Sequence, residues 1–179
     1  MLRLTGIGII KVLDRKENEN MGRNAWKGIV GREKIYNNLF AGVEKDTAIQ
    51  IDVLNIKKEQ ELILEFISSN SKYPQGVGLA LYEGDGYIEI NGQRAKQMAI
   101  WKDTAPKKNK IFCFSSEGLV SIYNEYYKYN PGTGRSEVRH QMDSCGMLVE
   151  QKGNKVIYRC NDEGFEPKFD ALVFSIEII

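Results

Sequence analysis

The sequence predicts a single all-β domain, an antiparallel β-sandwich for which a jelly-roll topology is favoured. Ile and Val together far outnumber Ala, and 17 Gly stand against 4 Pro, a balance that favours strands and tight turns over helices. From residue 29 onward, apolar and polar residues mostly alternate with a period of two. Turn signals recur about every 8 to 12 residues, which is typical of sandwiches and barrels. Because several strands have one apolar and one polar face, we favour the sandwich.

The N-terminal part predicts one strand followed by a long loop. Residues 1–13 form an apolar run that Lys11 interrupts, and no small-residue cleavage site follows, so a strand is a better interpretation than a signal peptide. Residues 14–28 are polar and rich in Gly and Asn, which predicts a loop over an edge of the domain. A helix, if there is one, is expected within residues 14–40. No composition shift divides the chain, so we expect one domain over residues 1–179.

Residues 47–68 are expected to form an antiparallel pair around a polar turn at residues 57–60. In the first strand Ile49, Ile51 and Val53 share one face, and Asp52 lies on the opposite, polar face. A helix is the alternative for residues 58–67, because Glu, Gln and Leu are good helix formers. The β-favouring composition of residues 63–67 favours the strand.

The later turns are clearer. A turn at residues 83–86 separates strands at 77–82 and 87–90. Asn91-Gly92 predicts a two-residue hairpin turn, since both central residues of a type I′ turn need positive φ, and residues 93–101 would form its second arm. Further strands are expected at residues 111–114, 119–129, 135–142, 147–150, 156–160 and 169–178.

Composition excludes several classes of function. With 25 Lys+Arg against 24 Asp+Glu, the net charge of +1 does not give the basic footprint of a nucleic-acid binder. No stretch approaches the roughly 18 apolar residues that a membrane-spanning helix needs. Cytoplasmic residence is the default expectation, although the mature form of an exported protein would look the same.

The reactive side chains predict no catalytic or metal site. Cys113, Cys145 and Cys160 form no Cys-x-x-Cys pair, so we interpret them as buried thiols, with a Cys145–Cys160 bridge as the less favoured alternative. His140 precedes Cys145 by five residues, but nothing around that cysteine resembles a nucleophile motif. A structural zinc site needs a short ligand knuckle that is absent. We therefore expect neither an enzyme nor a cofactor.

An acidic segment near the C-terminus leaves one metal question open. Asp162, Glu163, Glu166 and Asp170 could surround a calcium ion, whose hard oxygen ligands often sit on loops. Solvated loop carboxylates are the favoured interpretation, since charged groups normally lie outside.

The aromatic strand at residues 119–129 carries the functional hypothesis. Tyr123, Glu125, Tyr127 and Tyr129 share one face of it, and Trp101 is a further flat surface. Tyr side chains beside polar groups suit sugar rings and protein interfaces alike, whereas cross-strand pairing that only stabilises the sheet is the alternative. We expect a non-catalytic binding module that recognises a glycan or another small polar ligand through these five residues. The alternative is a protein-interaction domain, such as an immunity, inhibitor or assembly protein, that binds a partner protein.

Overall fold

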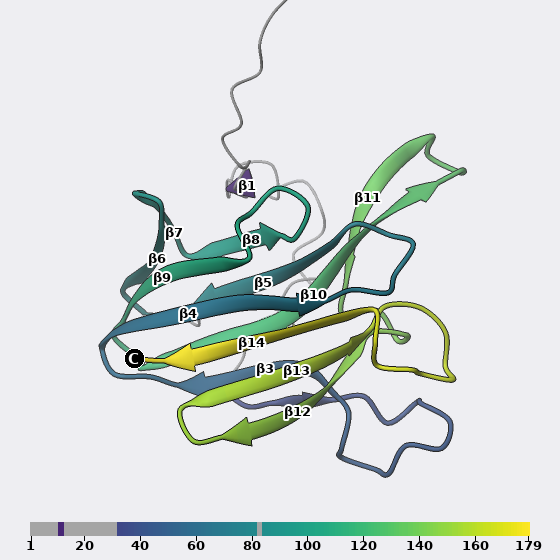
Figure 1. Cartoon of the computed structure of the whole chain (residues 1–179), viewed down its shortest axis with the longest axis horizontal. Coiled ribbons are helices and arrows are strands. Elements are labelled where there is room, and N and C mark those ends of the chain that lie inside the picture. The colour runs from purple at the N-terminus through teal and green to yellow at the C-terminus, as the bar shows by residue number, and fades with distance from the viewer. Residues whose placement is uncertain (1–10, 13–31, 82–83) are drawn as a thin grey trace, which may run out of the picture.

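A computed structural model describes residues 11–12, 32–81 and 84–179, and every regular element in these ranges is a β-strand (Figure 1). The strands are β1 (Lys11–Val12), β2 (Ile35–Tyr36), β3 (Ile49–Asn55), β4 (Glu59–Ser68), β5 (Gln75–Leu81), β6 (Gly86–Ile90), β7 (Gln93–Ala95), β8 (Gln97–Trp101), β9 (Lys108–Ser115), β10 (Leu119–Asn130), β11 (Arg135–His140), β12 (Gly146–Lys152), β13 (Lys155–Asn161) and β14 (Leu172–Ile178). A search of the described residues finds no helix suited to crossing a membrane. The loop predicted at residues 14–28 lies outside the described residues, as does the strand predicted at 1–13 except for β1.

All pairings between the described strands are antiparallel, and they join the strands into one continuous sheet. Its order is β1-β8-β5-β10-β3-β12-β13-β14-β4-β9-β6-β7, with β11 beside β10 and β2 beside β3. The sheet curves until it is nearly closed into a barrel (Figure 1). At one corner the chain itself connects β7, at one end of this order, to β8, the strand next to the other end, because β7 continues through Lys96 into β8. The carbonyl of Lys96 accepts a hydrogen bond from the backbone of Leu81 at 2.9 Å.

The all-β, antiparallel prediction is confirmed, but a two-sheet sandwich with jelly-roll topology is not. β3 belongs to both halves of the sheet: residues 52–55 pair with β10, and Ile49 pairs with Met147 of β12. A strand shared in this way makes one barrel-like sheet of the two halves. Alternation shows which side chains face inward, but it does not show which strands are neighbours, so it cannot distinguish a barrel from a sandwich.

The Asn91-Gly92 signal gave a correct hairpin, but its second arm ends at Ala95, because residues 97–101 form β8 and pair with β5 instead. The strand pair predicted at residues 47–68 is wrong. β6 and β7 form the hairpin around Asn91-Gly92, and both turn residues have positive φ. β3 and β4 are strands as predicted, but β3 pairs with β10, β12 and β2, and β4 pairs with β14 and β9. The connection between them binds the β9–β10 turn instead, since the carbonyl of Lys58 accepts a hydrogen bond from the backbone of Ser115.

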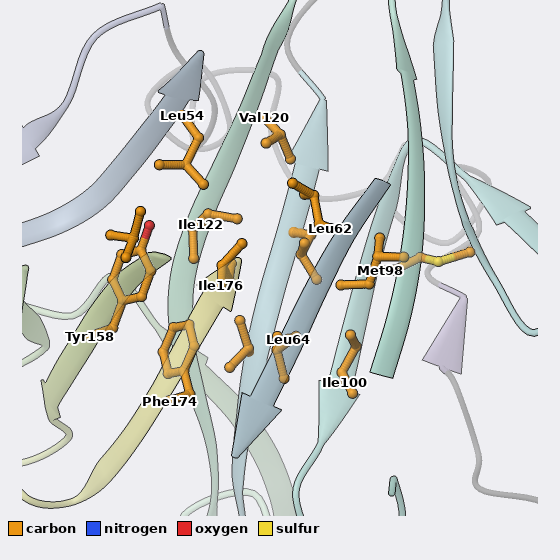
Figure 2. Packing of buried hydrophobic residues seen from close by; sticks show 14 of the residues in the cluster. Leu54, Leu62, Leu64, Met98, Ile100, Val120, Ile122, Tyr158, Phe174 and Ile176 are labelled. Carbon is orange, nitrogen blue, oxygen red and sulfur yellow. The ribbon is translucent and has the colours of Figure 1, made fainter. Parts of the chain in front are cut away.

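The main core fills the space enclosed by the curved sheet, and residues from most of the longer strands meet there (Figure 2). Leu62 and Leu64 of β4, with Ile122 of β10, are fully buried in it. The rings of Tyr158 and Phe174 stack with centroids 4.7 Å apart. Burial of each such side chain stabilises the fold by about 1.5–3 kcal/mol.

The predicted polar face of β3 is the face that enters the core. Leu54 belongs to the main core cluster, and Asp52, two residues earlier on the same face, is fully buried. The Asp52 carboxylate accepts a 2.8 Å hydrogen bond from the hydroxyl of Tyr158 and forms a 2.9 Å ion pair with Lys34. These partners compensate the cost of burying the charge. The expectation that Asp52 lies on a solvated face is therefore wrong.

Candidate functional site

The structure brings four of the five predicted binding residues together on the outer face of β10, opposite its core face. Tyr123, Glu125 and Tyr127 follow one another at alternate positions of the strand. Trp101 of β8 stacks on Tyr127, with ring centroids 4.3 Å apart. We call these four residues the β10 aromatic cluster. Tyr129 lies farther out, on the part of the β10–β11 hairpin beyond the pairing with β5, and is 59% exposed.

Glycines of β5 form the surface on which this cluster rests. β5 lies between β10 and β8, and Gly78 and Gly76 face the cluster. A Cβ added at Gly78 would lie 2.2 Å from the ring of Tyr123, and one at Gly76 would lie 2.9 Å from the ring of Trp101. The two rings therefore pack directly against the backbone of β5, and this packing requires glycine.

Burial differs from one residue of the β10 aromatic cluster to the next. Tyr127 is half-buried, and Tyr129 is exposed. Tyr123, by contrast, has no exposed surface, and Glu125 is 2% exposed. A ligand cannot contact these two side chains unless the structure around them rearranges.

Glu125 is a buried carboxyl group in an aromatic environment. No described residue donates a hydrogen bond to it, and burial raises its pKa to about 8. Burial, together with the nearby carboxyl group of Glu125, also raises the pKa of Tyr123, whose hydroxyl accepts a 2.6 Å hydrogen bond from Gln97. His140 lies opposite Glu125 in the β10–β11 pairing, and burial lowers its pKa. At neutral pH this group of residues therefore favours the uncharged forms of both the acid and the imidazole.

The three cysteines are free and buried, so the alternative of a Cys145–Cys160 bridge is not formed. Burial raises the pKa of Cys113 to about 12 and that of Cys145 to about 11, and it also raises the pKa of Cys160. A thiol nucleophile reacts as the thiolate. None of the three has that form near neutral pH.

The Cys–His pair weighed from the sequence is not assembled. His140 places its ring 5.7 Å from that of Tyr123, on the outer face of β10. Cys145 interacts instead with Tyr126, whose side chain lies on the other face of that strand. The strand therefore separates the thiol from the imidazole.

A second aromatic group, which sequence reasoning missed, lies on the outer face of β6 and β9. The ring of Tyr87 stacks on Phe114 at 5.7 Å and lies 6.2 Å from Phe112. Arg94 lies over Tyr87 at 4.3 Å, and Lys58 over Phe114 at 5.5 Å. We call Tyr87, Phe112 and Phe114 the β6–β9 aromatic row. The alternation of the two phenylalanines with core residues of β9 is a sequence signal that would have found it.

The loops after β4 and β13 line an open polar pocket of about 310 Å³, here called the loop pocket. This volume lies at the lower end of the roughly 300–1,000 Å³ found for small-molecule sites. The residues that line it are Asn70, Ser71, Lys72, Tyr73, Asn161, Asp162, Glu163, Glu166, Lys168, Asp170 and Ala171. The acidic members were singled out from the sequence, whereas residues 70–73 were not, although they form a polar run directly after a strand.

Asp162 is the most enclosed carboxylate of the loop pocket, at 9% exposed. Its Oδ2 accepts hydrogen bonds from the hydroxyl of Ser71 and, at 3.0 Å, from the amide of Gln75. Both bonds reach the same oxygen, and no described residue donates to Oδ1. The carboxylate is thus held in place by neutral donors, and one acceptor oxygen remains available to the pocket.

Glu163 is the carboxylate of the loop pocket that cations neutralise. It pairs with Lys128 and, at 3.4 Å, with Lys72, and it accepts a 2.8 Å hydrogen bond from the hydroxyl of Tyr73. The ammonium of Lys128, followed by the Tyr73 hydroxyl, holds the pKa of Glu163 below its usual value. This residue has little capacity left for a ligand.

The described residues do not support the calcium site that the acidic segment left open. All four acids of the segment line one pocket, but no three His, Cys, Asp or Glu side chains of the described chain converge closely enough to hold a metal ion. Asp170, for example, accepts a 2.9 Å hydrogen bond from the amide of Asn70.

Comparisons with protein-family models, with curated proteins and with solved structures return no match for this chain. Function therefore has to be inferred from the arrangement of the side chains.

Proposed function

We propose that this protein is a non-catalytic binding module whose ligand, a glycan or another small polar molecule, binds in the loop pocket. The observation that carries this proposal is the state of Asp162, which is nine-tenths buried and held through a single oxygen. A buried carboxylate is costly unless hydrogen bonds satisfy it. A ligand that donates a hydrogen bond to Oδ1 would give both oxygens of Asp162 a partner. Ser71 and Gln75 already fix the position of this carboxylate.

The loop pocket supports binding better than the five residues first expected from the sequence. Within the β10 aromatic cluster Tyr123 and Glu125 are enclosed, and the exposed Tyr129 lies apart from them on the hairpin. The pocket, by contrast, presents amide, hydroxyl and carboxylate groups at its surface. Such groups give a polyhydroxylated ligand the donors and acceptors that fix its orientation.

We propose binding rather than catalysis because no thiol and no imidazole lines the pocket. The three thiols of the chain are buried outside the lining, and each has a raised pKa. Cytoplasmic residence, with these thiols reduced, is part of the same proposal.

The test is a binding titration with a panel of monosaccharides, followed by the amide chemical shifts of the protein. We expect shifts that are confined to residues 70–73 and 161–171. Asp162→Asn should weaken binding at least about tenfold, because a hydrogen bond to a charged group contributes about 1.5–3 kcal/mol. Asp103→Asn, an exposed acid outside the pocket, is the control and should bind as the wild type does.

Shifts centred on Tyr127 and Tyr129 would place the ligand on the β10 hairpin and overturn the pocket as the site. A panel that produces no shift anywhere would overturn glycan binding as such.

A protein-interaction domain is the second candidate, and the β6–β9 aromatic row is the observation that favours it. Its three rings form an outward-facing group with Arg94 and Lys58 against them, beside the short strand β7. Tyr and Arg side chains are enriched among residues that dominate protein interfaces. Capture of a partner from the native host should be lost with Tyr87→Ser and retained with Tyr36→Ser, an exposed tyrosine on β2. Equal capture by both variants would count against this candidate.

A further inference from the structure

We infer that the ligand of the loop pocket carries a primary ammonium group on a hydroxylated carbon frame, as an amino sugar does. The inference rests on the proposed function, namely that the loop pocket binds a small polar ligand, and it adds the charge of that ligand.

The charges that line the pocket do not balance. Four carboxylates face two ammonium groups, those of Lys72 and Lys168. Glu163 pairs with Lys72 and also with Lys128, which reaches it from β10, so three ammonium groups in all face the four carboxylates and one negative charge is left in excess. Three carboxylates then remain, and Lys168 is the only lining cation that is not already paired with Glu163.

The three remaining carboxylates have no cationic partner among the described residues. Asp162 is held by the neutral groups of Ser71 and Gln75, and Asp170 by the neutral amide of Asn70. Glu166 is exposed, and no described residue forms a hydrogen bond or ion pair with it. A concave surface lined by an excess of one charge concentrates its field and attracts the opposite charge. A pocket with this excess of negative charge should favour a cation over an anion.

Geometry favours an organic cation over a metal ion. Calcium takes six to eight oxygen ligands at about 2.3–2.6 Å, and the described residues provide no group of three acids close enough to begin such a shell. An ammonium group has three N–H donors, each of which reaches an acceptor about 2.7–3.2 Å from the nitrogen. Acceptors that are spread over a pocket, such as Asp162 Oδ1 and the Asp170 carboxylate, suit it.

The size and remaining lining of the pocket indicate the frame that bears the ammonium. A volume of about 310 Å³ exceeds what one ammonium group fills. The carboxylate of Glu166 and the side chains of Asn70 and Lys168 also line this space, and all of them can hydrogen-bond to hydroxyl groups. A purely apolar alkyl chain would leave these groups without partners.

The experiment compares four probes by calorimetric titration at pH 6 and low salt: glucosamine, N-acetylglucosamine, glucose and butylamine. We expect glucosamine to bind at least about tenfold more tightly than each of the others, a difference of about 1.4 kcal/mol. Added salt should weaken the binding of glucosamine far more than the binding of glucose, because salt screens the attraction between the ammonium group and the carboxylates.

Substitutions in the loop pocket test whether its carboxylates cause the preference for glucosamine over glucose. Asp162→Asn should reduce the preference for glucosamine over glucose to less than about threefold, and Lys168→Met should increase it. Asp170→Asn is a second neutralising variant, on a more exposed side chain, and it should also reduce the preference if Asp162→Asn fails to fold. Asp103→Asn should leave the preference unchanged.

The outcomes separate this inference from the proposed function. If glucose binds in the loop pocket as tightly as glucosamine, the binding module stands and the ammonium inference is overturned. If butylamine matches glucosamine, the hydroxylated frame is overturned. If no probe binds, both the inference and glycan binding are overturned.

Discussion

Two groups of aromatic side chains lie on the outer face of the sheet, and only one of them is enclosed. In the β10 aromatic cluster Tyr123 and Trp101 are buried. In the β6–β9 aromatic row the rings are half-buried, and cationic side chains lie against two of them. Both groups come from strands in which outer-face residues alternate with core residues, so the pattern within the strand does not explain the difference.

The neighbouring strand explains why the two aromatic groups differ in exposure. β5 places Gly78 beside Tyr123 and Gly76 beside Trp101, so the rings lie against the backbone. On one side of β9 lies β4, which places Glu61 opposite Phe112 and Glu59 opposite Phe114. Charged side chains keep water nearby, and the rings remain partly exposed. The exposure of an aromatic side chain on a sheet surface is thus set by the residues across from it as much as by its own position.

The largest expected effect separates the two groups directly. Tyr123→Ala should destabilise the protein by about 3–5 kcal/mol, as truncation of a buried aromatic does. Phe114→Ala should cost less than about 1 kcal/mol, because that ring is already partly in water. Urea unfolding at neutral pH measures both. Equal losses would mean that the two groups contribute alike to the fold, and the comparison would fail.

A smaller effect tests whether the Tyr123 ring packs directly against the backbone of β5 at Gly78. Gly78→Ala should destabilise by about 3 kcal/mol, since its Cβ would overlap the Tyr123 ring and the strand or the ring must shift. Gly132→Ala, in the β10–β11 turn, is the matched control. Its Cβ would meet only the side chain of Asn130, at 3.3 Å, so we expect a change below about 1 kcal/mol. If Gly78→Ala is as mild as the control, the packing against β5 is looser than the structure shows.

The last expected effect is a pH dependence that comes from Glu125. Its pKa rises from 4.5 in the unfolded chain to about 8 in the fold, so between these values the folded state keeps a proton that the unfolded state releases. Stability should therefore fall as the pH rises through this window. Glu125→Gln removes this pH-dependent contribution and should be more stable than the wild type at pH 9, with little difference near pH 5.

Thermal or urea unfolding of both proteins across pH 5–9 measures this difference. The lowered pKa of His140 acts in the opposite direction, but it is common to both proteins and cancels in the comparison. Glu150→Gln, on an exposed side chain of β12, should follow the wild-type curve. Parallel curves for wild type and Glu125→Gln would show that Glu125 is ionised within the fold.

The sequence predicted features that neighbouring residues determine. Asn91-Gly92 forms its hairpin because positive φ at two adjacent positions is a local requirement. The burial of Tyr123 depends on Gly78 in another strand, and the hold on Asp162 depends on Ser71 in a loop far away in the sequence. The two members of each pair come close only because of the order of the strands in the sheet. The alternation of apolar and polar residues does not predict that order. The acids of the loop pocket were therefore noticed, but their partners were not.

The single pairing between β3 and β12 has a mechanical consequence. Where most neighbouring strands share several register pairs, these two share one, Ile49 with Met147. Side chains add to the connection at this place: the amide of Asn37 donates 2.7 Å hydrogen bonds to the carbonyls of Asp143 and Cys145, and that of Gln50 donates one of 2.9 Å to the carbonyl of Met142. The backbone N–H of Asn37 donates to Ala48 at 2.8 Å. If the barrel were pulled apart at this line, much of the force would fall on the side chains of Asn37 and Gln50 rather than on a ladder of backbone hydrogen bonds.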